Sequence, residues 1–262
     1  MACVGGWTRY CASMPHTKPF KRTARHFVDL SYQNNGRSRY IRNKFFAEDG
    51  RRYIRAAVML QSDLLKLFEF IEPAESNFNC YSFRIHELLT RASIEIEANF
   101  KAILRENNYT KPGDWNIQDY RKLERTHFLS QFQVKIPDFL DPDFAFTPFE
   151  NWTEKGQPAW HQAYNSTKHD RHAEFEKASF GNLLNAMGGL FVVLAAQFHT
   201  EDLSGAPDLL SLGSGRSDGF SRVAGDLFRV KFPVLANRDD MYEFEQSDIS
   251  DEPASFQTHN YV

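Results

Sequence analysis

The stretch from Phe180 to Phe198 is the part of this 262-residue chain that most restricts its fold. Its side chains are apolar on nearly every side of a helix, which predicts a helix that other elements must cover on several sides. The longest apolar run within it, Met187 to Phe198, falls well short of the ~20 residues that cross a bilayer. We therefore predict a core helix and no membrane contact. Gly188 and Gly189 lower its intrinsic helicity but allow a neighbouring helix to approach closely.

Two earlier segments show the spacing of amphipathic helices. Apolar residues at steps of three and four predict a helix over residues 51–71, which Pro73 ends. A second apolar stripe covers residues 85–103, and Asn77 or Asn79 is positioned to cap that helix.

A ladder of alternating charge lies on the other flank of the second helix. Arg84, Glu87, Arg91 and Glu95 follow one another at steps of three or four residues, so neighbouring members lie within reach. One interpretation is a solvated face held by weak ion pairs. The other is that part of the ladder faces a cleft and orients histidines that come later in the chain.

The remaining segments predict shorter elements. Asp114 or Asn116 is expected to cap a short helix over residues 117–128. Prolines and Asp-Phe pairs over residues 137–158 predict a long irregular lid or clamp. Its expected aromatic anchors are Trp152 and Trp160. A fourth helix is expected to have Pro158 in its first turn, short strands are expected near Tyr40 and over residues 228–235, and a Gly- and Ser-rich linker is expected over residues 204–219.

These elements predict an all-α fold. We expect a bundle of four to five helices over residues 51–200, because one core can be buried by a chain of this length. A basic arm over residues 1–50 precedes the bundle. A small loop-rich extension over residues 201–262, irregular or partly β, follows it and ends in an acidic tail.

Charge is distributed unevenly between the ends of the chain. Residues 1–55 contain twelve Lys or Arg against three Asp or Glu, whereas residues 239–252 contain seven Asp or Glu and no Lys or Arg. A basic arm with interleaved aromatic residues can follow a phosphate backbone and stack on bases. It can equally pair with the protein's own acidic tail.

Cysteine content points to a reducing compartment. Cys3, Cys11 and Cys80 have no metal-ligand spacing and cannot form a disulfide framework. The first residues lack the apolar region of a signal peptide. We therefore predict a cytoplasmic protein without a structural metal or a cofactor.

Titratable side chains concentrate between Trp160 and His172, just before the core helix. The segment contains three histidines, two cations and an Asp. Polar groups at the edge of a core are costly unless paired, and such places often have perturbed pKa values and function. This segment is the candidate site.

The run from Tyr164 to His169 resembles the signature of the HEPN superfamily, the helical nucleotide-binding and ribonuclease domains of prokaryotic toxin and defence systems. The resemblance covers about residues 52–199. Asn165 and His169 match the signature, whereas Tyr164 stands where catalytic members have Arg. The resemblance implies RNA or nucleotide binding, a homodimer, and metal-independent RNA cleavage.

The resemblance also implies a role for each side chain of the site. His169 would transfer protons and Asn165 would orient it, while a cation in place of the missing Arg would stabilise charge on the phosphate. The expected catalytic residues are His169, Asn165 and Arg171. The expected phosphate contacts are Lys168, Arg91 and Arg84, and the expected supporting residues are Tyr164, Asp170, Glu87 and Glu95.

Three alternatives remain open. His169 and Asp170 can serve as the adjacent ligands of an HD-type metal phosphohydrolase, completed by other histidines. The further ligands would be His86, His161 or His172. The chain can also be a non-catalytic interaction protein whose apolar helices dimerise. Finally, His169 and Asp170 can simply satisfy each other and cap helix ends, with Asn165 bonded to backbone.

Overall fold

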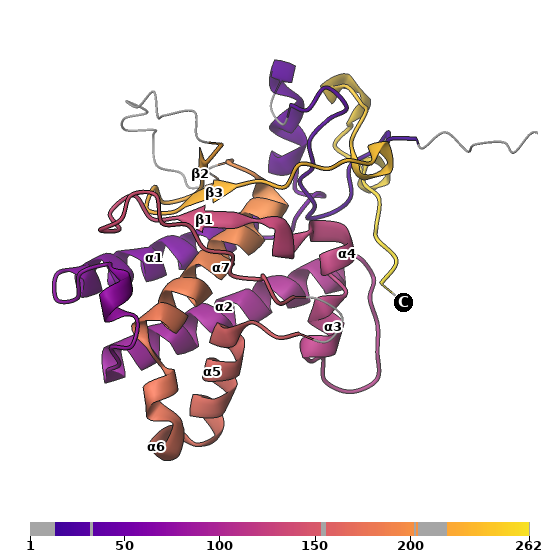
Figure 1. The fold of residues 1–262 in the computed structure, drawn as a ribbon. Helices are drawn as coiled ribbons and strands as arrows, with labels where there is room; N and C mark the ends of the chain where they lie inside the picture. Colours follow the sequence, from indigo (N-terminus) through magenta and orange to yellow (C-terminus); the bar gives the residue numbers. More distant parts are fainter. Residues whose placement is uncertain (1–13, 32–33, 153–155, 202, 204–218, 262) are drawn as a thin grey trace, which may run out of the picture.

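The computed structural model describes residues 14–31, 34–152, 156–201, 203 and 219–261. Within these residues the fold is mostly helical (Figure 1). The α-helices are α1 (Gly50–Phe68), α2 (Phe83–Glu106), α3 (Ile117–Arg121), α4 (Glu124–His127), α5 (Ala159–His169), α6 (Arg171–Glu174) and α7 (Phe180–Phe198). Short 3-10 helices are η1 (Asn34–Arg42), η2 (Glu75–Asn77), η3 (Leu129–Gln131), η4 (Phe175–Lys177), η5 (Arg238–Asp240), η6 (Gln246–Asp248) and η7 (Pro253–Ser255).

The prediction of an all-α bundle of four to five helices is wrong. The described residues contain seven α-helices and a three-stranded antiparallel sheet in the order β1-β3-β2. The strands are β1 (Gln133–Lys135), β2 (Ser221–Arg222) and β3 (Arg229–Lys231). Only β3 was expected, within residues 228–235. Strands of two or three residues are too short to show the alternation that predicts a strand.

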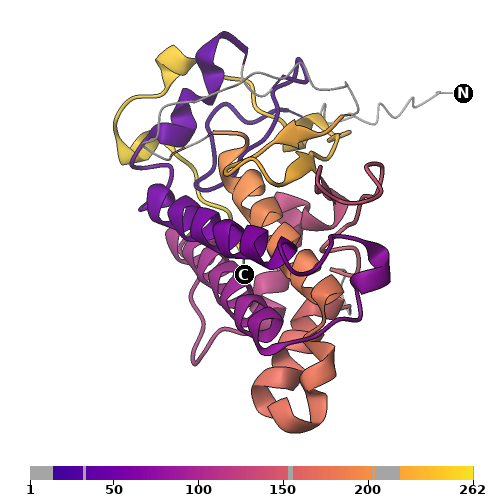
Figure 2. The same cartoon turned by 90° about the vertical axis from the view of Figure 1, so that its left-hand side faces the viewer.

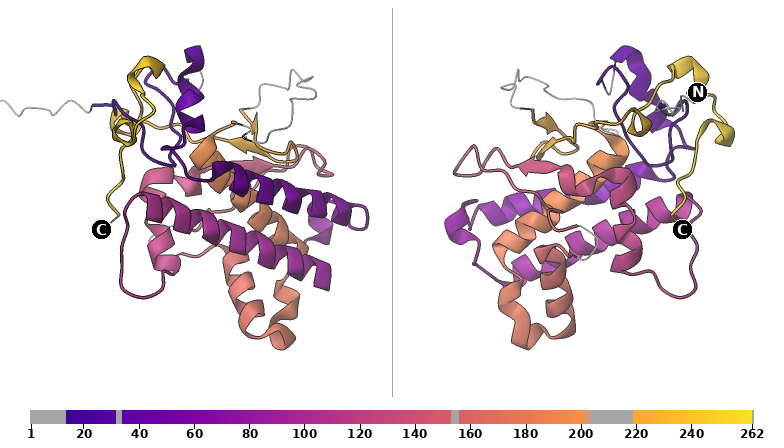
Figure 3. Two further views of the ribbon diagram at one scale, coloured as in Figure 1. Left: turned by 180° about the vertical axis from the view of Figure 1, so that it is seen from behind. Right: turned by 45° about the vertical axis from the view of Figure 1, so that its right-hand side comes forward.

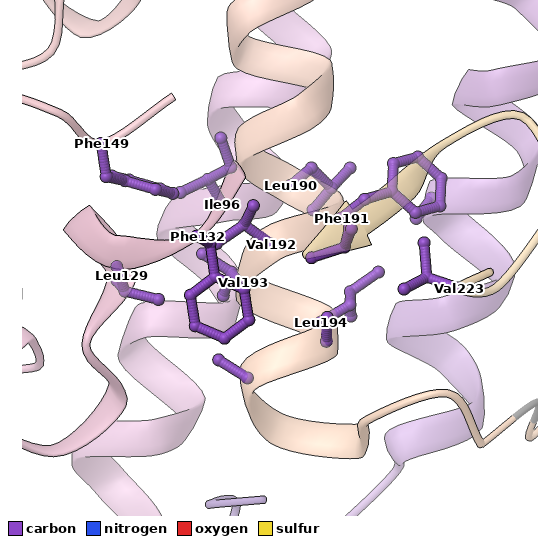
Figure 4. Packing of buried hydrophobic residues seen from close by; sticks show 14 of the residues in the cluster. Ile96, Leu129, Phe132, Phe149, Leu190, Phe191, Val192, Val193, Leu194 and Val223 are labelled. Atoms are coloured by element: carbon purple, nitrogen blue, oxygen red, sulfur yellow. The ribbon is translucent and has the colours of Figure 1, made fainter. Parts of the chain in front are cut away.

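Helix α7 lies at the centre of the core, as its composition predicts. All of its residues except Asn182 and Asn185 are buried. Side chains from α2, from the segment after α4 and from the sheet region surround it, as Ile96, Phe132 and Val223 show (Figure 4). Among the described helices only α7 is long and apolar enough to cross a membrane, and 83% of that stretch is buried inside the protein. Such burial is typical of the core helix of a soluble protein.

The segment that approaches α7 closely at Gly188 and Gly189 is a loop, and not the neighbouring helix that we expected. A Cβ atom on Gly188 would lie 2.7 Å from Cε2 of Phe146, whereas one on Gly189 would lie 3.5 Å from the Phe149 ring. The irregular segment expected over residues 137–158 therefore packs on α7 through its aromatic rings. Both expected anchors of that segment are buried, and the Trp160 indole donates a hydrogen bond of 2.9 Å to the Pro148 carbonyl.

Several local predictions need correction. Ser82, and neither expected Asn, caps α2 by accepting from the Ile85 amide. Asn116 caps α3 as one of two expected residues, but the expected helix over 117–128 is divided between α3 and α4. Phe128, the last residue of the expected range, has a left-handed backbone and ends α4. The segment around Tyr40 forms η1 instead of a strand. The linker expected over residues 204–219 lies, except for Gly219, outside the described residues.

The basic N-terminal segment pairs with the acidic tail. Arg37 contacts Glu245 at 2.6 Å and Lys44 contacts Asp251 at 3.2 Å. Backbone bridges join His16 and Phe27 to Tyr242. Figures 1 and 3 show the indigo and yellow segments side by side. The described residues of the N-terminal segment, the helices and the C-terminal segment contribute to one hydrophobic cluster.

Arg22 joins this paired layer to the helices. Its side chain is 1% exposed, and its Nε lies 2.6 Å from the Glu106 carboxylate at the end of α2. It also donates to the Gln197 side chain of α7 at 2.9 Å and to the Glu48 carbonyl before α1. A buried guanidinium needs such partners, because an unpaired buried charge costs about 3–5 kcal/mol.

The two glycines of α7 give a matched test of the aromatic packing. We expect Gly188→Ala to destabilise the fold by about 1–2 kcal/mol, because overpacking against Phe146 outweighs the better helix propensity of Ala. Gly189→Ala should be neutral or stabilising by up to about 1 kcal/mol. Urea unfolding followed by circular dichroism measures both. Equal effects from the two substitutions would contradict the packing.

Buried histidines hold the junction of the two terminal segments. His127 lies 2.9 Å from the Arg22 carbonyl and 2.8 Å from the Thr126 hydroxyl, and His259 stacks on Phe20 at 3.8 Å. Burial lowers the pKa of His127 from 6.5 to about 4, and burial followed by nearby positive groups lowers the pKa of His259 to about 2. Both imidazoles are therefore neutral in the folded state at pH 7.

These lowered pKa values predict a loss of stability in acid. Between pH 6.5 and about 4 the unfolded chain binds protons that the folded protein excludes, so the free energy of unfolding falls as pH falls. Each unit of difference in a histidine pKa corresponds to about 1.4 kcal/mol. Urea unfolding at several pH values should show this slope, and His127→Gln should reduce it. The same slope in both proteins would contradict this origin.

Candidate functional site

Helices α5 and α6 project from one end of the bundle (Figures 1 and 2). Pro158 directly precedes the first residue of α5, close to its expected place. Trp160, Tyr164 and Thr167 are buried and attach α5 to the bundle, where α5 packs on α2 and α7. On the opposite side of α5, the polar side chains of Gln162, Lys168 and His169 are exposed to solvent. The candidate segment is therefore divided between a buried face, which includes His161, and an exposed helical surface.

Asn165 contacts a different histidine from the one expected. The NH2 group of its amide lies 3.3 Å from Nδ1 of His161, and because this group can only donate, Nδ1 accepts. Burial, and then Lys168, lowers the pKa of His161 to about 4. His161 precedes Asn165 by four residues and His169 follows it by four, so both lie on one helix face. Spacing alone could not distinguish these two partners.

His169 and Asp170 do not interact with each other. His169 is the last residue of α5 and is exposed, and its ring makes no hydrogen bond within the described part of the chain. The Asp170 carboxylate accepts from the Ala173 amide at 3.1 Å and so caps α6. The alternative in which His169 and Asp170 satisfy each other and cap helix ends is therefore right about the cap at Asp170. It is wrong about the pairing of the two residues.

The two cations of the segment lie over aromatic rings. Nζ of Lys168 is 5.3 Å from the centre of the Tyr164 ring, and the Arg171 guanidinium is 5.7 Å from that of Phe83. Tyr164 is buried in place of the signature Arg and supplies a ring instead of a charge. Neither cation forms an ion pair with a carboxylate of the described residues. Both remain available to an anionic ligand.

Exposed aromatic rings adjoin Arg171, and the sequence analysis missed them. Tyr81 is 46% exposed and Phe83 is 67% exposed, and their rings lie 5.6 and 4.8 Å from the ring of Phe175. His86 completes the group at 5.9 Å from Phe175. We call these five residues the α2–α6 surface. The sequence held one sign of this surface, because Tyr81 and Phe83 flank Ser82, the residue that caps α2.

His86 is the polar member of the α2–α6 surface. Its Nε2 is buried and has no hydrogen-bond partner among the described residues. Burial, and then the charge of Arg171, lowers the pKa of His86. The imidazole therefore favours its neutral form beside Arg171.

The charge ladder of α2 faces α1 instead of the histidines. Arg91 contacts Asp63 of α1 at 2.7 Å, and Arg84 contacts Glu87 at 3.1 Å. These residues line a hollow of about 390 Å³ between α1 and α2. Burial raises the pKa of Glu95, which Arg91 opposes. No histidine is among the residues that line this hollow, so the ladder does not orient His169 there.

The described residues do not assemble a metal site. No group of three or more His, Cys, Asp or Glu side chains among them is placed to share a metal ion. Asp170 is engaged as a helix cap and His161 with Asn165. This arrangement does not favour the HD-type alternative.

Comparison with protein-family models, curated proteins and solved structures finds no match to this chain. Function must therefore be argued from the geometry of the site. The resemblance to HEPN domains stays a prediction.

The contact between Asn165 and His161 can be tested by titration. His161 should titrate near pH 4 in ring NMR spectra. Asn165→Asp should raise the pKa of His161, because a carboxylate at that position favours the charged imidazole. Gln162→Asp adds the same charge to a side chain that points away from His161 and should shift it less. A wild-type His161 that titrates near 6.5 would contradict the burial described above.

Proposed function

We propose that the protein binds single-stranded RNA through the α2–α6 surface. The observation that carries the proposal is the pair of exposed rings, Tyr81 and Phe83, together with Arg171, which lies over the Phe83 ring and has no carboxylate partner among the described residues. Bases stack on exposed aromatic rings and on guanidinium planes, and free cations contact the phosphates between them. Lys168 extends the cationic edge along α5.

Stacking, more than overall charge, supplies the affinity in this proposal. Residues 168–177 contain three Lys or Arg and three Asp or Glu, so the projecting segment has no net charge with neutral histidines. The most basic segment of the chain is partly neutralised by the acidic tail. We therefore expect little sequence preference and a modest salt dependence.

Binding without cleavage fits the side chains better than catalysis does. General acid–base chemistry at a 2′-hydroxyl requires a histidine held against its substrate and a positioned cation. Asn165 is engaged by His161, so His169 lacks the orienting partner that the resemblance implies. Lys168 rests on the ring of Tyr164, where the signature would place an Arg.

The location and the biological setting are also proposals. Cys80 is an exposed free thiol, which a reducing cytoplasm preserves, whereas Cys3 and Cys11 lie outside the described residues. A role in a prokaryotic toxin or defence system is implied by the HEPN resemblance alone.

Removing one ring of the α2–α6 surface should weaken RNA binding. Phe83→Ala should raise the dissociation constant about 5- to 150-fold, since stacking of one base contributes about 1–3 kcal/mol. Fluorescence anisotropy with a short labelled single-stranded RNA measures the change. Val234→Ala removes another exposed apolar side chain, which follows β3, and should have no effect. Arg171→Ala should weaken binding, whereas Arg55→Ala, an exposed arginine of α1, should not.

The same RNA incubated with EDTA distinguishes binding from cleavage. Intact RNA with binding that depends on Phe83 supports the proposal. Cleavage that survives chelation and disappears in His169→Ala would replace it with the ribonuclease alternative. Cleavage that requires a metal would favour the phosphohydrolase alternative. No binding and no cleavage would refute every nucleic-acid interpretation.

A further inference from the structure

Three cations lie side by side across the small sheet. The strand register pairs Lys135 of β1 with Arg229 of β3, and it pairs Arg229 with Arg222 of β2. Directly paired residues of neighbouring strands point to the same face, and neighbouring strands lie about 4.8 Å apart. The row therefore crosses all three strands, with Arg229 at its centre (Figure 1).

This row lies on the outward face of the sheet. Val134 and Val230, the middle residues of β1 and β3, are fully buried in the core. Because side chains alternate along a strand, the cations on either side of these valines point away from the core. Lys231 lies on the same outward face as Arg229, and its register partner is Gln133. None of the residues in the three strands is an Asp or a Glu.

The centre of the row has no carboxylate partner. Arg229 forms no ion pair within the described part of the chain, and its buried Nε has no hydrogen-bond partner there. Lys135 lies 3.8 Å from an oxygen of Asp143, and Arg222 lies 3.7 Å from an oxygen of Asp226. Both distances are too long for a hydrogen bond, and both carboxylates are mostly exposed to solvent. Such pairs contribute little and leave the two outer cations available.

The row destabilises the sheet unless an anion compensates it. Like charges directly opposite each other on neighbouring strands repel one another. The unsatisfied Nε of Arg229 adds a second cost, because a buried donor has lost its contact with water. An anion held over the central strand would reduce the repulsion along the row. The outward face therefore has the features of a binding site more than those of a structural contact.

We propose that the outward face of the sheet binds a phosphate monoester, with Arg229 at the centre and Lys135 and Arg222 on either side. A monoester carries about 1.5 to 2 negative charges at pH 7 and has three acceptor oxygens, so it can accept from all three strands. The planar guanidinium of Arg229 suits paired phosphate oxygens. A phosphodiester carries a single charge and compensates less of the row.

The phosphate, and not an aromatic base, is the recognised group. The ring beside the row belongs to Phe220, and Nζ of Lys135 lies 4.7 Å from its centre. That ring is already engaged by a cation, so it offers no free face to a base on that side. The ligand class is therefore a small molecule or a headgroup that ends in a phosphate monoester.

This inference does not depend on RNA binding. The sheet shares no residue with the α2–α6 surface, where the RNA proposal uses Tyr81, Phe83 and Arg171. Phe83→Ala should weaken the binding of RNA and leave the binding of a phosphate monoester unchanged. Either proposal can therefore fail while the other stands.

Isothermal titration calorimetry on the full chain tests the site with two matched esters. At about pH 8, above the second phosphate pKa of about 6, methyl phosphate has two charges and dimethyl phosphate has one. Methyl phosphate should bind saturably. Dimethyl phosphate should bind about 10-fold more weakly or less well still, because it loses a charge-assisted hydrogen bond. Equal affinities for the two esters would overturn the proposal.

Removal of the central cation separates a binding role from a structural one. Arg229→Gln should weaken methyl phosphate binding about 10-fold or more. It should not lower the melting temperature of the free protein, because it relieves the repulsion along the row. Arg105→Gln removes an exposed arginine of α2, outside the sheet, and should leave the affinity unchanged. An affinity that Arg229→Gln leaves intact would contradict the site, and so would an equal loss from both variants.

A soluble ester and a lipid headgroup can present the same phosphate. Co-sedimentation with vesicles of phosphatidylcholine and phosphatidic acid distinguishes them. Binding to these vesicles that Arg229→Gln abolishes would identify the lipid as a ligand, whereas binding to methyl phosphate alone would identify a soluble ester. A chain that binds neither methyl phosphate nor the vesicles would refute the site.

Discussion

A single buried guanidinium connects the N-terminal segment to the ends of two long helices that come much later in the sequence. Arg22 bonds to the end of α2 through Glu106 and to α7 through Gln197, which itself donates to Asn99 of α2 at 3.0 Å. An arginine that is 1% exposed is tolerated only because its donors are satisfied in this way. The packing of α2 against α7 and the docking of the N-terminal segment therefore depend on one polar network inside an aromatic core.

The parts of the fold that could be predicted are those whose own residues determine their environment. The bounds of α7 follow from a run that is apolar on all sides, and α1 differs from its expected range by a few residues at its end. The sheet could not be predicted, because β1 is three residues long and pairs with a strand almost a hundred residues later. The contact of the Phe146 loop with Gly188 could not be predicted either. A small residue indicates that another segment approaches closely, but it does not show which segment.

The structure does not bring the expected residues of the candidate site together. Two histidines, His161 and His169, lie four residues from Asn165. The amide of Asn165 bonds to His161, which is the buried one of the two. Arg84 and Arg91 lie on α2 as expected, but the rotation of that helix turns them toward α1. Phe83 came to the site through tertiary packing with Phe175, a contact that no local pattern contains.

The pairing of the N-terminal segment with residues 240–257 has a consequence for synthesis on the ribosome. Phe20 forms its bridge with Gln257, and the Tyr242 hydroxyl donates to the Thr23 carbonyl at 2.8 Å. Because domains begin to fold from the N-terminal side as the chain emerges, this segment must wait for residues 240–257 before it can be enclosed. Residues 20–23 therefore complete their packing only after residues 240–257 have left the ribosome, although they are made long before them.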